Sequence, residues 1–442
     1  MKQTEIGLIP DDWKEHTLRD LIDILTDYTA NGSFESLARN VRYLEYPSYA
    51  RLIRLTDIRT NFTNEGVYVS KYSYDFLKKS SLHGGELLLA NVGAYAGFSF
   101  IYPENLMFRG TLGPNMFLIK FFNQKIDNTF AYYAFSHGAV YNQLISKAAS
   151  SAQPKLNKED VRTCYINIPS SIQEQQRIAK ALSDVDALIS TTEKLIQKKK
   201  NIKQGTMQNL LTGKKRLPGF AKSTNYKQTE LGPIPEDWEV KNLGEIFEFR
   251  PNNTFTRDCL NDSKGKYQNV HYGDVLIKYP SILDCSKETI PFINEGINVK
   301  FSKYGIVEGD IIIADTAEDE TVGKVVEVFN LGEKKIVSGL HTFLCRKITD
   351  DFAPKWLGYF MNQAIFHNQL LPFITGTKVS AISRTAIQNV KVLIPSKEEQ
   401  TAIANVLSSM DKEIETLNTK LEKYINLKTA MMQQLLTGKI RL

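Results

Sequence analysis

Two polar loops carry the residues whose types best suit the binding of an anion. These residues are Gln153, Lys155 and Asn157 within 150–157, and Lys378, Ser383 and Arg384 within 376–384. A short helix is predicted to begin at Asn157 and another at Ser383, because both residue types are favourable N-caps. The N-terminus of a helix, together with small polar residues and a lysine, suits a phosphate group. The alternative is a surface loop whose polar residues only cap the helix that follows.

Further polar residues lie in loops beside predicted strands and are weaker candidates for the same surface. They are Asn91, Arg109, Thr316 and His341. A lone histidine in such a loop is more often structural, and His341 is open to that interpretation. The acidic run at 318–320 has no lysine nearby in a nuclease-like arrangement, so we interpret it as a solvated loop.

Catalytic signatures are absent from the sequence. It contains no Walker-type phosphate loop, no Asn-Pro-Pro-aromatic methyltransferase signature and no His-Glu-x-x-His zinc motif. We therefore expect no catalytic residue, no metal ligand and no cofactor site in this chain.

The elements that must position these loops occur twice. Residues 3–13 return as residues 228–238, and Leu-Leu-Thr-Gly-Lys at 210–214 returns at 435–439, in both cases at a spacing of 225 residues. The opening segments and the C-terminal segments agree well between the copies, whereas the regions between them agree poorly. This contrast favours one scaffold that presents two different surfaces, the alternative being ordinary drift after a duplication.

A long helix of about 40 residues is predicted to end each copy. Its apolar residues follow steps of four and three, which is a heptad seam. They are Ile178, Leu182, Val185, Ile189 and Ile196 in the first copy, and Ile403, Leu407, Met410, Ile414, Leu417 and Leu421 in the second. A helix with one apolar stripe must bury it. We expect the two helices to pack antiparallel within the chain around a pseudo-two-fold axis, the alternative being pairing with a second molecule.

The regions between the repeated segments have the pattern of mixed α/β domains. Strands are predicted at 86–90, 310–314 and 324–329, and helices at 129–147 and 354–371. The predicted organisation is a first domain with its opening segment, a long helix, a second opening segment with its domain, and a second long helix. Their bounds are residues 1–165, 166–216, 217–391 and 392–442.

Composition sets broad limits on the class of protein. The chain has 442 residues, of which 42% are hydrophobic, and a net charge of +6, which suits a polyanionic partner without proving one. The four cysteines are scattered singly, so neither a zinc site nor a disulfide framework is indicated. The sequence contains no run of about 18 apolar residues, the length needed to span a membrane. We expect a cytoplasmic protein without a membrane partner.

The duplicated motifs resemble a known family over essentially the whole chain. They are Ile-Pro-x-Asp-Trp at 9–13 and 234–238, Glu-Gly-Asp-Ile-Ile-Ile-Ala at 308–314, Ile-Pro followed by Glu-Gln at 168–175 and 394–400, and the Leu-Leu-Thr-Gly-Lys helix ends. In this order, twice, they resemble the specificity subunit of type I restriction-modification systems.

The resemblance implies a function and a set of partners. Two α/β target-recognition domains would each read part of a split site in double-stranded DNA, and the antiparallel helices would set the spacing. Two modification subunits carrying S-adenosylmethionine, and restriction subunits using ATP and Mg²⁺, would assemble with the chain. Under this interpretation Gln153 could contact a base edge in the major groove.

Two other functions remain open on the sequence. A coiled-coil scaffold without a nucleic-acid role would explain the repeat and the helices, but not the loops. A self-contained nuclease would have only the acidic run at 318–320 in its favour.

Overall fold

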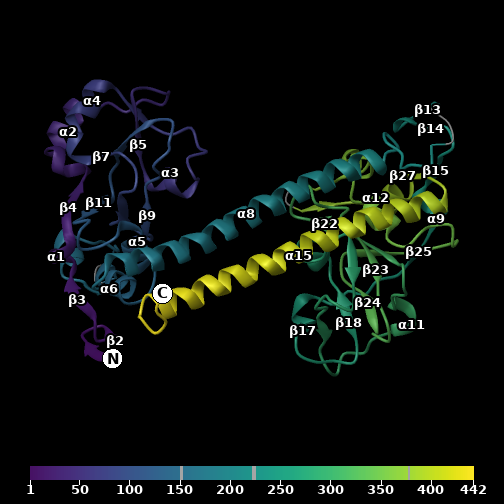
Figure 1. The fold of residues 1–442 in the computed structure, drawn as a ribbon. Helices are drawn as coiled ribbons and strands as arrows, with labels where there is room; N and C mark the ends of the chain where they lie inside the picture. Colours follow the sequence, from purple (N-terminus) through teal and green to yellow (C-terminus); the bar gives the residue numbers. More distant parts are fainter. Residues whose placement is uncertain (150–152, 222–224, 377–378) are drawn as a thin grey trace. The chain divides into compact units, whose positions relative to one another are not determined.

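The structure of the protein is a computed structural model that describes residues 1–149, 153–221, 225–376 and 379–442. The described chain forms two compact units (Figure 1). Unit 1 comprises residues 1–193 and 419–442, and unit 2 comprises residues 194–418. Each unit therefore combines one of the two divergent regions with parts of both long helices, whereas the predicted segments treated each helix as a separate part.

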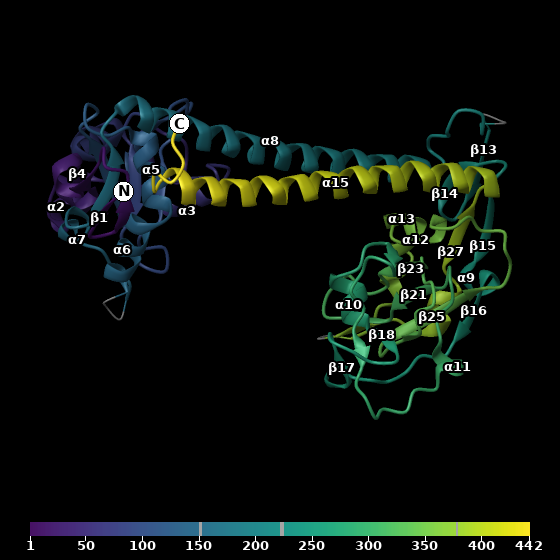
Figure 2. The same cartoon turned by 60° about the horizontal axis from the view of Figure 1, so that its bottom comes forward.

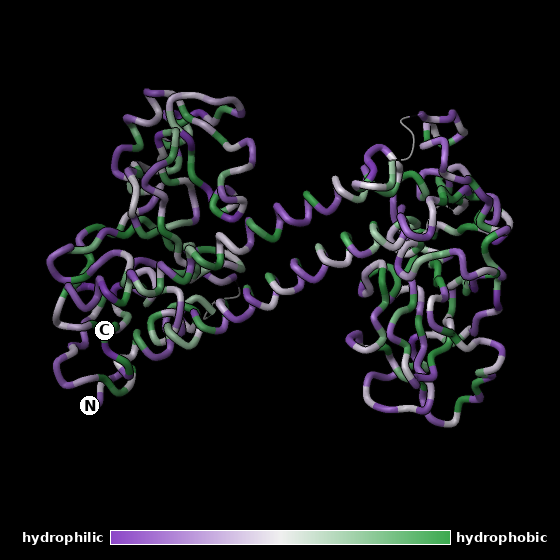
Figure 3. Tube along the Cα trace, turned by 45° about the vertical axis from the view of Figure 1, so that its right-hand side comes forward, coloured by the Kyte–Doolittle hydropathy of each residue, from purple (hydrophilic) through white to green (hydrophobic). Residues whose placement is uncertain are grey.

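Both long helices form as the sequence predicts. They are α8, Ile172–Leu210, and α15, Lys397–Leu435, each of 39 residues. Ile178 and Leu182 are fully buried in unit 1, as are Ile403 and Leu407 in unit 2. Hydrophobic and hydrophilic residues alternate along both helices in Figure 3, as a heptad pattern requires.

The two helices run antiparallel, as the ion pairs of unit 2 show. Lys199 of α8 pairs with Glu413 of α15 at 2.6 Å, and Lys203 pairs with Asp411. A position further along α8 thus meets a position earlier along α15. The predicted internal antiparallel pairing is confirmed.

One of these ion pairs is repeated in unit 1. Lys428 of α15 pairs with Asp186 of α8 at 2.7 Å. Asp186 and Asp411 are 225 residues apart in the sequence, and so are Lys203 and Lys428. The pseudo-two-fold repeat is therefore present in the contacts, with the roles of the two helices exchanged between the units.

The predicted seam is buried unevenly along the two helices. Val185 and Ile196 are each 6% exposed. The remaining predicted seam residues are only half-buried: Ile189, Met410, Ile414, Leu417 and Leu421. A stripe on one helix needs more than a single facing helix to enclose it, so these positions keep part of their surface in water.

Two four-stranded sheets form the divergent region of unit 1. Their strand orders are β4-β11-β8-β9 and β6-β5-β10-β7. The strands are β4 Ile22–Asp27, β5 Ala50–Ile53, β6 Tyr68–Val69, β7 Ser81–Leu82, β8 Leu87–Ala90, β9 Ser99–Ile101, β10 Arg109–Leu112 and β11 Met116–Phe121. Strands β5 and β10 are parallel, and their neighbours are antiparallel.

Unit 2 also has two sheets, of which the first has one strand more than its counterpart in unit 1 and the second has a different outer strand. Its sheets have the orders β16-β25-β21-β23-β19 and β17-β20-β18-β24. The strands are β16 Phe247–Arg250, β17 Leu260–Asn261, β18 Gln268–Val270, β19 Ile282–Asp284, β20 Phe292–Ile293, β21 Ile311–Ala314, β23 Val325–Phe329, β24 Ile336–Ser338 and β25 Thr342–Lys347. Strands β18 and β24 are parallel, like β5 and β10. The predicted mixed α/β class is confirmed for both regions.

The predicted strands are confirmed, but the two longer predicted helices are each broken. Residues 129–147 form α5, Asn128–Ser136, and α6, Ala139–Ala148, while residues 354–371 contain α12, Trp356–Phe360, and α13, Ala364–His367. Gly138 interrupts the first pair with φ at 76°, a conformation that glycine adopts without strain. Gln363 interrupts the second with an extended backbone.

The opening segments are short hairpins, each followed by a strand that leads into the divergent region of its unit. The hairpins are β1 Lys2–Thr4 with β2 Gly7–Ile9, and β13 Tyr226–Thr229 with β14 Gly232–Pro235. The next strand, β3 Trp13–Thr17 or β15 Glu239–Asn242, pairs with the strand that leads into the long helix, β12 Tyr165–Pro169 or β27 Lys391–Ile394. The start and the end of each divergent region are thereby held together.

Glycines at the helix ends explain the Thr-Gly-Lys repeat. Gly213 and Gly438 have φ values of 71° and 66°, which is the left-handed conformation expected just after a helix. A Cβ atom at either glycine would lie 2.5 Å from Pro235 or Pro10 of the adjacent opening segment. The repeated glycine therefore fits both the helix end and the proline that packs on it.

An arginine three residues beyond each glycine binds two carboxylates in its unit. In unit 2, where the hairpin β13–β14 lies near the start of α15 (Figure 2), Arg216 pairs with Asp237 at 2.8 Å and with Glu399 at 2.5 Å. In unit 1, Arg441 pairs with Asp12 at 2.7 Å and also with Glu174. We call these two clusters the arginine clasps.

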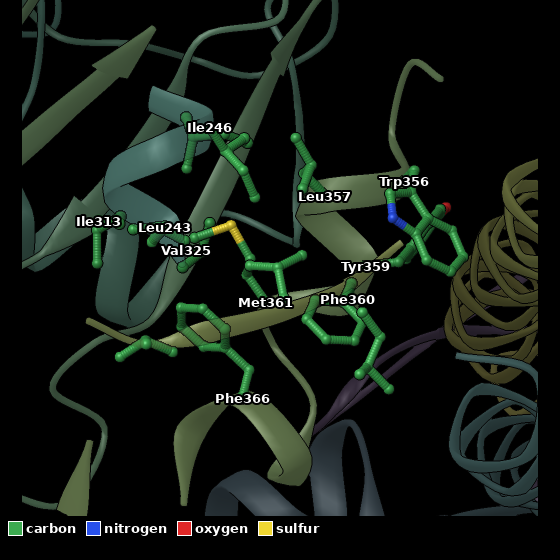
Figure 4. Packing of buried hydrophobic residues seen from close by; sticks show 14 of the residues in the cluster. Leu243, Ile246, Ile313, Val325, Trp356, Leu357, Tyr359, Phe360, Met361 and Phe366 are labelled. Carbon is green, nitrogen blue, oxygen red and sulfur yellow. The ribbon is translucent and has the colours of Figure 1, made fainter. Parts of the chain in front are cut away.

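Tryptophan and aromatic side chains fill the core of unit 2. Trp356, Tyr359, Phe360 and Phe366 of α12 and α13 pack together, with aliphatic residues of the sheet and of α9, Leu243–Ile246, beside them (Figure 4). Trp238 is fully buried and meets Trp356 edge-on at 6.4 Å between ring centres. The repeated tryptophan of the opening segment is thus a core residue.

Candidate nucleic-acid interface

Three segments of unit 1 meet where β8 ends. The backbone N–H of Asn91 donates to the carbonyl oxygen of Asn115 at 3.1 Å, and the N–H of Leu156 donates to the carbonyl of Asn91 at 2.8 Å. Asn115 precedes β11, and Leu156 lies in the polar loop before α7, Lys158–Arg162. We call this meeting point the loop junction of unit 1.

Unit 2 builds the same junction with the same hydrogen bonds. The N–H of Asp315 donates to the carbonyl of His341 at 3.1 Å, and the N–H of Ile382 donates to the carbonyl of Asp315 at 2.9 Å. Asp315 follows β21, His341 precedes β25, and Ile382 precedes α14, Arg384–Gln388. The two junctions therefore share one backbone framework.

Different side chains stand at the equivalent positions of this framework. Asn91 of unit 1 corresponds to Asp315 of unit 2, Asn115 to His341, and Lys155 to Ala381. Asn115 and His341 both have left-handed backbones, with φ values of 66° and 53°. Asparagine and histidine are among the non-glycine residues that tolerate this conformation best.

The side chains of unit 2 form a small network at the junction. The Oγ1 atom of Thr316 donates to Oδ1 of Asp315 at 2.7 Å, and it lies 3.3 Å from Nδ1 of His341. Nδ1 of His341 also lies 3.3 Å from Oδ1 of Asp315, and the edge of Tyr272 faces the ring at 5.3 Å between centres. The His341 side chain is 46% exposed, so a held ring projects into solvent.

The side chains of unit 1 are less connected. Asn115 and Lys155 are exposed. The Oδ1 atom of Asn91 is buried and has no hydrogen-bond partner among the residues that the structure describes. Lys155 forms a backbone bridge with Val92, which brings the lysine next to Asn91.

A short helix adjoins each junction and carries a buried aspartate. These helices are α3, Leu55–Arg59, and α10, Tyr272–Ile277. In unit 1 burial tends to raise the pKa of Asp57, but hydrogen bonds from Arg54, Arg51 and Asn64 outweigh it and lower the pKa to about 2. In unit 2 the equivalent Asp274 accepts two hydrogen bonds of 2.9 Å from Arg257.

Each short helix reaches the junction through the strand before it. Gly113 and Gly339 donate their N–H groups to the carbonyls of Ile53 and Val270 at 2.7 and 2.9 Å. These two residues end the parallel strands β5 and β18. The ion pairs of these two buried aspartates therefore fix the position of a helix that adjoins the candidate surface.

Several of the predicted residues lie together at the junctions, whereas Arg109 lies away from them. Asn91 and Lys155 meet in unit 1, and Thr316 and His341 meet in unit 2. Arg109 begins β10 and lies over the ring of Tyr49 at 4.6 Å, at the far end of that strand, about 10 Å from the turn before β11.

The remaining predicted residues lie in or near the loops before the short helices. The side chains of Asn157 and Ser383 cap α7 and α14 by accepting from Asp160 N and Ala386 N. Arg384 lies over the ring of Phe249 at 4.9 Å. Gln153 is exposed, and Lys378 lies outside the described residues.

The sequence analysis missed one junction residue in each unit. These residues are Asn115 in unit 1 and Asp315 in unit 2. A signal was present, because Gly113-Pro-Asn115-x-Phe aligns with Gly339-Leu-His341-x-Phe. Aligning the two halves at this glycine would have placed Asn115 opposite His341.

A metal-ligand cluster and a membrane-spanning helix are both absent from the described residues. They contain no group of three or more histidine, cysteine or acidic residues placed to hold a metal ion. Residues 318–320 are exposed, as a solvated loop would be. In the same part of the chain, no helix combines the length and apolarity needed to cross a membrane.

Comparison with known proteins identifies the family. The family described as the type I restriction modification DNA specificity domain matches residues 10–204 and again residues 235–426. A Methanocaldococcus jannaschii protein named as the type I restriction enzyme MjaX specificity subunit is 28% identical over the whole chain and 96% of its own length. The MjaVIII specificity subunit of the same organism is 27% identical over 98% of this chain and 94% of its own.

A solved structure supports the fold. The type I restriction-modification S subunit from M. genitalium superposes with a TM-score of 0.54 at 15% identity, covering 98% of each chain. The chain belongs to the type I restriction modification DNA specificity domain family and carries the domain twice.

Proposed function

We propose that this chain is the subunit of a type I restriction-modification enzyme that reads a bipartite site in double-stranded DNA. Unit 1 contacts one half of the site and unit 2 the other. The chain supplies recognition, and methyl transfer and cleavage are carried out by partner subunits.

The observation that carries this proposal is the pair of loop junctions. The same hydrogen-bonded framework occurs in both units, yet Asn91, Asn115 and Lys155 of unit 1 are replaced by Asp315, His341 and Ala381 in unit 2. Amide and carboxylate groups are among those that read base edges in the major groove, and an imidazole likewise offers a hydrogen-bond donor or acceptor. Two domains that recognise different DNA sequences need the same backbone framework with different side chains on it.

Cations near the junctions would position the backbone of the duplex. Lys155 and Arg59 are exposed in unit 1, and contacts of such groups to phosphates orient a protein without reading sequence. Each phosphate contact releases counterions, so affinity should fall as salt rises.

Partners complete the proposed enzyme. The curated relatives are named as specificity subunits of type I restriction enzymes. By analogy we assign two modification subunits carrying S-adenosylmethionine, and restriction subunits using ATP and Mg²⁺, to an assembly with this chain. The two exposed faces of the long helices are the simplest place for them to dock, and the cytoplasm, where such a system meets DNA, is the proposed location.

Selection from random duplex DNA tests the proposal. The full-length chain, alone and purified with its modification subunits, is used to select sites that are then sequenced. We expect two short conserved blocks separated by a spacer of fixed length, and binding that weakens steeply between low and high salt. Recovery of one continuous block, or of no motif, would contradict the proposal and favour a scaffold.

A further inference from the structure

We propose that one pair of residues in each unit decides the base preference at one position of each half-site. The pairs are Asp315 with His341 in unit 2, and Asn91 with Asn115 in unit 1. The inference rests on the proposed DNA-reading function and specifies which side chains carry it. The second member of each pair contacts the base, and in unit 2 the first member positions it.

The backbone places the second residue in an exposed turn of the junction. His341 and Asn115 follow tight glycine-containing turns and have left-handed φ values of 53° and 66°. Each is the last residue before a buried strand, β25 or β11. The strand fixes where the side chain starts, and the exposed turn directs it outward.

Asp315 and Thr316 select one orientation of the His341 ring. Nδ1 of His341 lies 3.3 Å from both Oδ1 of Asp315 and Oγ1 of Thr316. Because the Thr316 hydroxyl donates to Asp315, its oxygen is left to accept from the Nδ1–H group, and the Asp315 carboxylate lies beside the same nitrogen at ion-pair distance. In the neutral ring the proton then resides on Nδ1, and Nε2 is an acceptor.

The exposed nitrogen of His341 has no partner within the described part of the chain. No hydrogen bond there involves its Nε2 atom. A hydrogen-bond acceptor that enters the major groove matches the exocyclic amino group of adenine or cytosine. Tyr272, edge-on to the ring at 5.3 Å, limits its rotation and keeps this acceptor in place.

Asn115 offers a different chemistry at the same place. A side-chain amide both donates and accepts, which matches the N6 and N7 atoms of adenine. Asn91 replaces the charged Asp315, so unit 1 presents no carboxylate at this point. The two half-sites are therefore read by unlike groups mounted on one framework.

Glycine substitutions test the two contact residues without straining the backbone. His341→Gly and Asn115→Gly are made in the full-length chain, since glycine adopts the left-handed conformation freely. Asn330→Gly is the matched control, because Asn330 is exposed, also has φ at 53°, and follows β23 at the other end of the unit 2 sheet. Sites are selected from random duplexes for each variant, and dissociation constants are measured on the wild-type site.

We expect each glycine variant to lose base preference at one position of its own half-site. Binding to the wild-type site should weaken about tenfold, as for loss of one good base contact. The other half-site, read by the unaltered unit of the same molecule, serves as a folding control. Asn330→Gly should keep both blocks and the wild-type affinity.

The positioning role of Asp315 is tested separately. Asp315→Ala should weaken the base preference at the same position as His341→Gly does. Asp315→Asn keeps an acceptor beside Nδ1–H and should retain the wild-type base preference there. A purely structural role for Asp315 would lower the stability of both variants without moving the preference at that one position.

The outcomes separate this inference from the proposed function. If the wild-type chain selects no motif, the proposed function fails. If the wild-type chain selects a bipartite motif and both His341→Gly and Asn115→Gly select it unchanged with wild-type affinity, the function stands and the inference is overturned.

Discussion

The two loop junctions have the same backbone but differ in how firmly their side chains are held. In unit 2, Asp315, Thr316 and His341 form a connected network, with Tyr272 against the ring. In unit 1, Asn115 makes no side-chain hydrogen bond to any residue that the structure describes, and Oδ1 of Asn91 is buried without a partner there. The framework therefore does not depend on the side chains it presents, and these can change without rebuilding the fold.

The arginine clasps show the opposite behaviour. Arg216 and Arg441 bind equivalent carboxylates, Asp237 with Glu399 and Asp12 with Glu174. Here the side chains themselves are repeated. Residues that join the opening segment to the helices are kept alike between units, while the residues at the loop junctions are not.

Replacement of a whole recognition region gives the largest expected effect. Exchanging residues 14–165 for the corresponding region of another family member should replace the first half-site completely and leave the second unchanged, because the regions belong to separate compact units. The reciprocal exchange of residues 239–391 is the control. Selected sites in which both blocks change together would contradict independent reading.

Breaking the arginine clasps should destabilise the units to different extents. The Arg216 side chain is 8% exposed and its partner Glu399 is 1% exposed, whereas the Arg441 side chain is 42% exposed. Arg216→Met leaves a carboxylate buried without its partner and should lower the free energy of unfolding by about 3–5 kcal/mol.

Arg441→Met should cost less, about 2 kcal/mol, since water screens the more exposed pair. Urea unfolding followed by tryptophan fluorescence and hydrogen exchange compares the two variants. Arg39→Met, which removes a fully surface ion pair with Glu35, is the control and should change stability by less than about 1 kcal/mol. Equal losses for Arg216 and Arg441 would mean that burial does not set the strength of the clasps.

Acid should weaken unit 1 through Asp57. Since its pKa is lowered to about 2 from an ordinary value of 3.8, ionised Asp57 stabilises the fold above about pH 4, and this contribution is lost as the pH falls toward 2. The loss should be about 2 kcal/mol.

Asp57→Asn provides the test. The variant should be less stable than the wild type at neutral pH, and the difference should shrink between about pH 4 and pH 2. Free energies of unfolding measured across this range would show it. A difference that stays constant with pH would rule out the charged form of Asp57 as the stabilising one.

The smallest effect is expected at a contact that is the same in both units. Tyr133 donates to Asp186 at 2.7 Å in unit 1, and Tyr359 donates to Asp411 at 2.7 Å in unit 2. Tyr133→Phe and Tyr359→Phe should each lower the free energy of unfolding by about 1–2 kcal/mol. Equal values would confirm that the helix contacts are equivalent, and values differing by more than measurement error would limit that equivalence to geometry.

The sequence predicts the scaffold well because the scaffold depends on local patterns. Heptad spacing gives both long helices, and favourable N-caps at Asn157 and Ser383 give the short ones. The two broken helices were not predicted, since apolar spacing continues across Gly138 and Gln363 while the backbone there turns away.

The candidate site was predicted only in part, because it is assembled by contacts between distant segments. Asn91 and Lys155 come together through hydrogen bonds that span more than sixty residues of sequence. Arg109 looked similar to these residues in the sequence, but the direction of β10 places it at the far end of the strand. Such placement follows from strand order, which composition and periodicity do not encode.

The division of the chain into units has a consequence for its synthesis on the ribosome. Unit 2 is one continuous stretch, residues 194–418, whereas unit 1 needs residues 419–442 as well as residues 1–193. The region translated first must therefore wait for residues 419–442, including Arg441, before its clasp can close. A nascent chain that has reached only residue 418 holds every residue of unit 2 and lacks part of unit 1.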